Sequence, residues 1–230
     1  IIRELHAIVD EAIETQQGRV EEDTVTYDIG RIDLELLRRE FERTPARNTT
    51  VQELKYVIEQ RLMRLLARNP LRTDFQQHYE EIVAEYNREK DRVTIEETFE
   101  ALLRFANELD EEEGRAVREG LDEESLAVFD LLRKPDLSAA DIKRIKKVSL
   151  ELLEKLKEKI AGIHDWRGRE ATRDAVHTLI RDFLWSSEEG LPEASYTEDD
   201  VESKAEDVFQ HVYVAYPTYP SPVYANGDVA

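Results

Sequence analysis

Apolar residues recur along most of this chain at spacings of three and four, with charged residues between them. That periodicity is typical of amphipathic helices, and prolines and capping residues then mark the helix ends. We therefore predict an all-α fold, a bundle of about nine to ten helices that could form two helical subdomains. The expected helices cover residues 32–43, 50–68, 74–90, 95–109, 139–160, 169–185 and 198–214, with two shorter helices that begin after Asp110 and Asp122.

Several of these starts show the spacing of a capping box, in which a hydroxyl side chain and an acidic or amide side chain three residues later bond each other's free backbone groups. Because this spacing occurs just before an apolar periodic run, we place a helix start at each one. The pairs are Thr50 with Glu53, Thr73 with Gln76, Thr94 with Glu97, and Ser138 with Asp141.

The two ends of the chain differ from this pattern. We interpret residues 1–30 as a connecting helix and a loop from a preceding region, and because the chain begins without Met inside an apolar periodic run, we expect it to be part of a longer protein. Residues 31–215 are the expected helical domain, with possible bends between subdomains near 132–138 and 161–168. Residues 216–230 are rich in proline, so an extended or disordered tail is expected there. Its tyrosines Tyr216, Tyr219 and Tyr224 could dock in a partner's groove or belong to an untethered end, the interpretation we favour.

Charge is distributed unevenly within a formal net charge of -20. Residues 31–72 hold ten basic and six acidic residues, whereas residues 96–124 hold twelve acidic and three basic, and residues 188–207 nine acidic and one basic. Because affinity for DNA comes largely from neutralising phosphates, only the N-terminal third is suited to face nucleic acid. The chain has no cysteine, which excludes disulfides, thiolate catalysis and thiolate-bound metals.

We assign no catalytic, cofactor-binding or metal-binding residue. The glycine pairs nearest to a phosphate-binding loop, such as Gly114 with Gly120, have the wrong spacing and no following lysine, and no two histidines stand four residues apart. Asp136, Asp141 and Lys143 superficially resemble the acids and lysine of a restriction nuclease, but they stand at an expected helix start, so we interpret the acids as capping residues. No apolar run is long enough to span a bilayer. We expect a cytoplasmic protein with no membrane contact.

One basic pattern stands out: Arg61, Arg64, Arg68 and Arg72 recur at spacings of three and four. These arginines could contact DNA phosphates or an acidic partner, or they could neutralise the acidic helices of the same domain, and we favour the second interpretation. We expect the basic residues Lys143, Arg144, Lys146 and Lys147 to be solvated, and the acids 110–113 to favour a helix start and not to bind an ion.

Several short runs recur in an order and spacing that match one known family. They are residues 30–33, 48–50, 66–75, 86–87, 117–121 and 127–132, with Trp166 and Trp185. Together they resemble the helical C-terminal domain of the R subunit of type I restriction enzymes, the subunit that carries motor and nuclease. The resemblance implies that a longer parent protein, a type I site-specific deoxyribonuclease, moves double-stranded DNA using ATP and cuts it with a magnesium-dependent nuclease in preceding domains. It also implies that the C-terminal helices dock the R subunit onto the methyltransferase and specificity subunits.

We therefore predict a non-catalytic assembly domain that has as partners these two subunits and the motor domains of its own chain. ATP and magnesium belong to the parent, and this part of it should bind double-stranded DNA weakly or not at all. The alternative is an accessory nucleic-acid-binding module that uses the arginine row at 61–72. An autonomous enzyme would need a pocket of converging carboxylates or histidines, which the sequence pattern does not show.

Overall fold

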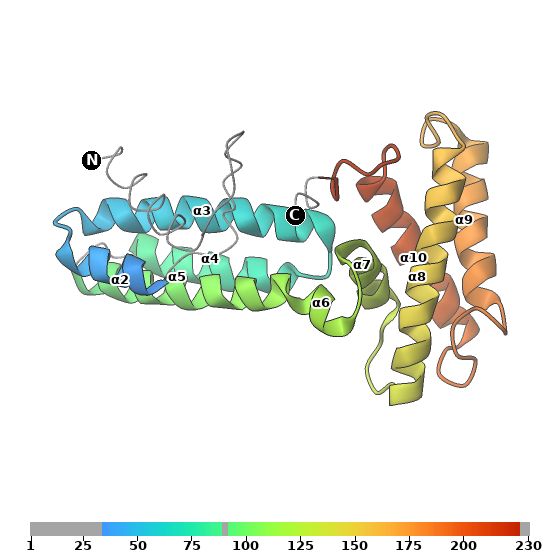
Figure 1. Ribbon diagram of the computed structural model, residues 1–230, viewed down its shortest axis with the longest axis horizontal. Coiled ribbons are helices and arrows are strands. Elements are labelled where there is room, and N and C mark those ends of the chain that lie inside the picture. The colour runs from blue at the N-terminus through green and yellow to red at the C-terminus, as the bar shows by residue number, and fades with distance from the viewer. Residues whose placement is uncertain (1–33, 89–91, 226–230) are drawn as a thin grey trace, which may run out of the picture. The chain divides into compact units, whose positions relative to one another are not determined.

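The computed structural model describes residues 34–88 and 92–225, and the regular structure in these ranges is entirely helical. The all-α prediction is thus confirmed (Figure 1). The predicted connecting segment 1–30 lies outside the described residues. The helices are α2 (Leu34–Arg43), α3 (Arg47–Arg68), α4 (Thr73–Arg88), α5 (Arg92–Glu113), α6 (Arg115–Glu119), α7 (Glu123–Leu132), α8 (Ala139–Ala161), α9 (Glu170–Trp185) and α10 (Glu198–Ala215).

Capping residues set the starts of the later helices as expected. The carboxylate of Asp122 accepts a 2.7 Å hydrogen bond from the backbone N–H of Ser125 at the start of α7. Ser138 and Asp141 form the predicted capping box of α8. This bond pattern supplies acceptors for N–H groups that the first helical turn leaves free.

Three other predicted caps are wrong, because Thr50, Thr94 and Asp110 lie inside helices. Helix α3 already begins at Arg47, after Pro45, whose fixed φ suits a helix start. Thr44 then supplies the local bond, since its hydroxyl accepts from the N–H of Ala46 at 3.2 Å. Helix α5 continues through Asp110 to Glu113. The capping-box spacing alone therefore does not identify a helix start.

The chain divides into two compact units, the first made of residues 1–61 and 77–113 and the second of residues 62–76 and 114–230. Both bends that we expected between subdomains, near 132–138 and 161–168, fall inside the second unit. Helix α7 packs against α8 and α8 against α9, so these bends are turns between neighbouring helices of one core.

The described part of the first unit draws its core from α2, α3, α4 and α5. The rings of Phe41 and Phe99 stack with centroids 3.8 Å apart, which joins α2 to α5. Tyr86 of α4 is buried, and its hydroxyl accepts a 2.6 Å hydrogen bond from the Gln52 amide and donates to the amide oxygen of Asn48. These bonds satisfy the polar atom of a buried ring.

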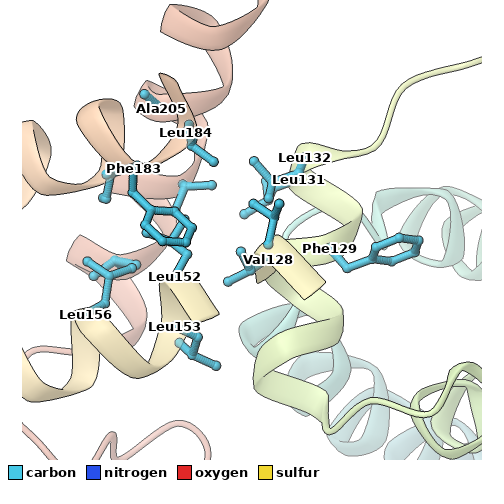
Figure 2. Packing of buried hydrophobic residues seen from close by; sticks show 14 of the residues in the cluster. Val128, Phe129, Leu131, Leu132, Leu152, Leu153, Leu156, Phe183, Leu184 and Ala205 are labelled. Carbon is cyan, nitrogen blue, oxygen red and sulfur yellow. The ribbon is translucent and has the colours of Figure 1, made fainter. Parts of the chain in front are cut away.

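The second unit is built mainly on α7, α8, α9 and α10. Helix α7 is buried almost all round from Ser125 to Leu132. Figure 2 shows Leu152 and Leu156 of α8 beside Phe183 of α9. Burying such side chains is the main favourable term for a helical core, at roughly 1.5 to 3 kcal/mol each.

The segment after α10 corrects the prediction of an untethered tail. Tyr216 and Tyr224 are buried in the core of the second unit, whereas Tyr219 is about half exposed. The Ser221 hydroxyl donates to the carbonyl of Ala215, which turns the chain back after α10. Proline content predicts the loss of helix, but it does not predict whether the residues between the prolines pack. Up to residue 225 the tail belongs to this core.

Candidate functional site

The arginine row begins with a residue that is not on the surface. Arg61, on α3, has a side chain that is 1% exposed, and its guanidinium donates to Glu113 at 2.9 and 3.3 Å and also to Asp110. Burial lowers the pKa of Arg61, but the hydrogen bonds and charges of Glu113 and Asp110 outweigh it, so the pKa is raised and the group stays charged.

This ion pair has a local electrostatic cause. Asp110 and Glu113 stand in the last turn of α5, where the negative end of the helix dipole disfavours acids. Arg61 offsets both charges at once. The acids 110–113 therefore end a helix and do not begin one, which corrects our expectation for this run.

The row ends with a second internal arginine. Arg72 is 3% exposed and donates to the two carboxylate oxygens of Glu123 at 3.0 and 3.5 Å. Glu123 lies in the first turn of α7, where an acid is favourable. The pair is thus part of the second unit's own architecture.

Between them, Arg64 is exposed and Arg68 is partly exposed. The structure does not bring the four side chains together on one surface, because Arg61 and Arg72 are buried and bound to acids of this chain. For those two residues our favoured interpretation, neutralisation of nearby acidic helices, agrees with the observed contacts.

In the second basic group, Lys143, Arg144, Lys146 and Lys147, two side chains make contacts beyond their own helix. Arg144 donates to the carbonyls of Gly190 and Ser187 at 2.8 and 2.9 Å, and the ammonium of Lys146 lies 2.7 Å from the carboxylate of Glu119. These two side chains tie α8 to the loop after α9 and to α6. The prediction that this group is merely solvated is wrong for both.

A polar cluster that sequence reasoning missed surrounds Asn69. The Asn69 side chain is fully buried, its amide donates to Asp130 at 2.6 Å, and its oxygen accepts from the N–H of Leu71 at 3.1 Å. Arg115 also binds the Asp130 carboxylate. In the sequence, Asn69 before Pro70 signals only a helix end. Its contact with Asp130 joins two of the runs that carry the family resemblance. The sequence around Asn69 does not indicate this contact, because Asp130 lies 61 residues further along the chain.

Within the described ranges, no two histidines come together in one site. His78 lies 3.1 Å from Glu108 and His177 lies 3.2 Å from Glu206, each as a single pair. His211 is buried, and its Nε2 lies 3.0 Å from the hydroxyl of Tyr224. Burial lowers the pKa of His211 to about 4. His6 lies outside the described residues.

Asp141 caps the start of α8 together with Ser138. Its carboxylate accepts from the Ser138 hydroxyl at 2.7 Å and from the Ser195 hydroxyl at 3.0 Å. The hydrogen bonds from Ser138 and then Ser195 lower the pKa of this carboxyl. Among the described residues, no group of three or more acidic, histidine or cysteine side chains could hold a metal ion, and no helix could cross a membrane.

Comparison with known proteins gives one family. Residues 2–216 match the family described as "Type I restriction enzyme HindI endonuclease subunit-like, C-terminal". A similar curated protein from Methanocaldococcus jannaschii is 26% identical over 155 residues, and its name assigns it provisionally to the type I restriction enzyme MjaIXP as endonuclease subunit. The matched region covers 66% of this chain but only 14% of that protein. No solved structure is significantly similar to the chain.

Proposed function

The chain belongs to the family of C-terminal domains of HindI-like type I restriction endonuclease subunits, and from this premise we propose that it is a non-catalytic assembly domain. It docks a DNA-translocating endonuclease subunit onto the methyltransferase and specificity subunits of the same complex. The observation that carries the proposal is the match of residues 2–216 to a domain of that subunit.

The distribution of charge supports docking to a protein and not to DNA. Several basic side chains are bound to acids or carbonyls of this chain, as at Arg61, Arg72 and Arg144. Exposed acids remain at the start of α10, at Glu198 and Asp199. A surface with this balance repels phosphates and complements a basic protein surface.

The matched region covers 14% of the length of the Methanocaldococcus jannaschii protein. We propose that the remainder of the parent protein binds ATP and magnesium, moves along double-stranded DNA and cleaves it. The domain described here would also contact those motor domains in its own chain, in the cytoplasm. The ion pairs at Arg61 and Arg72 then have a structural role, each within its own unit.

Calorimetry tests the docking role. The purified chain is titrated into the methyltransferase–specificity complex of the same organism, at physiological salt and after nuclease treatment. We expect saturable binding that weakens as salt rises, since charge complementarity contributes. A DNA duplex at the same concentrations is the matched control and should give no saturable heat. If the complex does not bind this chain but does bind the full-length subunit, docking resides elsewhere and the proposal is wrong.

A further inference from the structure

The end of α3 and the turn that follows carry an exposed surface of basic and apolar side chains. At about 100° per residue, its four helical members occupy one arc of about 140° and therefore share a face. Met63 is 56% exposed on this face, and Leu71, in the turn, is 52% exposed. We call this surface the α3 corner, and its members are Met63, Arg64, Ala67, Arg68 and Leu71.

The α3 corner is fixed to the rest of the second unit. Its members all lie in the 62–76 portion of that unit, and the residues that hold this portion belong to the same unit. A surface held in this way loses little conformational freedom when a partner binds. The contacts that hold it join Asn69 to Asp130 at 2.6 Å, Arg72 to Glu123 at 3.0 Å, and the carbonyl of Arg68 to the hydroxyl of Tyr224.

Two arginines of the corner have no counterion in the described ranges. The side chains of Arg64 and Arg68 form no ion pair there, although the whole chain has 52 acidic and 32 basic residues. Positive charges four residues apart on a helix repel each other, so this arrangement lowers the stability of the helix. Guanidinium groups bind carboxylates in a planar, bidentate geometry. The corner therefore offers two binding groups for acids of another molecule.

The apolar members indicate a protein partner and not a nucleic acid. Met63 and Leu71 have no group that can bond to a phosphate backbone, whose contacts are polar and charged. The centres of protein–protein interfaces are instead enriched in Met and Arg, and the unbranched Met side chain adapts its shape to the partner. An exposed mixture of these residue types fits a partner surface that has both carboxylates and apolar groups.

We propose that the α3 corner docks an acidic amphipathic helix of the methyltransferase–specificity complex. Carboxylates three or four residues apart on such a helix are separated by about 5 to 6 Å, the same spacing as Arg64 and Arg68, so each arginine binds one acid. An apolar side chain next to those acids packs on Met63 and Leu71. This inference rests on the docking role proposed above, and it adds a positive contact to the acidic surfaces considered there.

Charge reversal tests the proposal by calorimetry with the same complex. Arg64→Glu/Arg68→Glu should weaken binding at least about tenfold, because two attractive pairs are replaced by repulsion. The matched control Lys143→Glu/Lys159→Glu alters the net charge equally at two exposed lysines of α8 and should change the affinity less than about twofold. Urea unfolding midpoints like that of the unaltered chain show that both variants remain folded.

Zero-length cross-linking identifies the acids of the partner. Arg64→Lys/Arg68→Lys keeps both charges, and a carbodiimide joins a lysine ammonium to a carboxylate only when the two groups are in contact. The cross-linked complex is digested and its peptides are analysed by mass spectrometry. We expect position 64 or 68 to be joined to an Asp or Glu of the methyltransferase or specificity subunit.

The outcomes separate this surface from the docking role itself. If the unaltered chain does not bind the complex, both are wrong. If it binds and the Arg64→Glu/Arg68→Glu variant binds equally or more tightly, docking stands and only the α3 corner is wrong as its site. Cross-links from position 64 or 68 that reach only a second copy of this chain, or binding of duplex DNA that the charge reversal abolishes, would overturn the inference as well.

Discussion

Asn69 at the end of α3 donates a 2.6 Å hydrogen bond to Asp130 of α7, across 61 residues of sequence. The same amide group accepts from Leu71, so one buried side chain both turns the backbone at Pro70 and holds α7 in place. Because Asp130 also binds Arg115, removal of Asn69 leaves a charged group that is still partly paired.

Asn69→Ala should lower the free energy of unfolding by about 2 kcal/mol, since a buried hydrogen bond to a charged group is lost. Urea unfolding followed by circular dichroism measures the change. Asn87→Ala is the matched control, because Asn87 is exposed on α4, and it should change stability by less than about 0.5 kcal/mol. Equal effects at the two positions would show that the contact with Asp130 contributes nothing.

Arg61→Met should destabilise the chain by about 3 kcal/mol, because it leaves Asp110 and Glu113 unpaired at the negative end of α5. Arg64→Met, on the same helix but exposed, should cost less than about 0.5 kcal/mol. Adding Glu113→Gln to Arg61→Met should restore part of the loss, as measured by the urea midpoint. If Arg64→Met proves the more harmful variant, the ion pair is not what makes Arg61 important.

His211 should make the second unit sensitive to acid. Burial lowers the pKa of His211 to about 4 from its ordinary value of 6.5, so between these values the unfolded state binds the proton and the folded state does not. Stability therefore falls as the pH drops from about 6.5 to 4, and the contribution of this group is constant below that window. Between pH 7 and 5 the loss should be about 2 kcal/mol.

The difference between wild type and His211→Gln in urea unfolding at the two pH values isolates this contribution, because all other titratable groups are the same in the two proteins. His164→Gln, at an exposed position, is the matched control for replacing a histidine with glutamine. A His211→Gln variant that loses as much stability as the wild type between pH 7 and 5 would contradict the assignment.

Tyr224→Phe should cost about 2 kcal/mol, because the hydroxyl links His211 to the carbonyl of Arg68. That hydroxyl has one proton and donates it to Arg68, so the bond from His211 requires the neutral ring to carry its proton on Nε2. Tyr219→Phe, at a half-exposed position in the same segment, should leave the unfolding midpoint unchanged. If both variants behave alike, the tail is not anchored through this hydroxyl.

Asp122 and Ser138 can be predicted as caps from the sequence, because the backbone groups that they bond lie three residues away. Thr50 has the same local spacing, but a proline five residues earlier had already started the helix. Periodicity predicts the all-α class, although the predicted helix starts at Thr50, Thr94 and Asp110 are wrong. The family resemblance is confirmed by the match over residues 2–216.

The arginine row illustrates what local patterns cannot supply. Spacing places Arg61 and Arg64 on neighbouring positions of one helix, but it does not state which of them faces the core. That is decided by acids 49 to 52 residues away for Arg61 and 51 for Arg72. The buried tail tyrosines were missed for the same reason, since Tyr224 finds its partner 156 residues earlier.

This last separation bears on the order in which the protein can fold during synthesis. The residues that make up the first unit have all been translated once Glu113 is added. The second unit begins at Leu62 but needs Tyr224 to meet Arg68. Contacts so distant in sequence form late, because a long loop must close first. On the ribosome, the Leu62–Gln76 portion can therefore meet Glu123 and Asp130 early, but its contact with Tyr224 must wait until nearly all of this sequence has been translated.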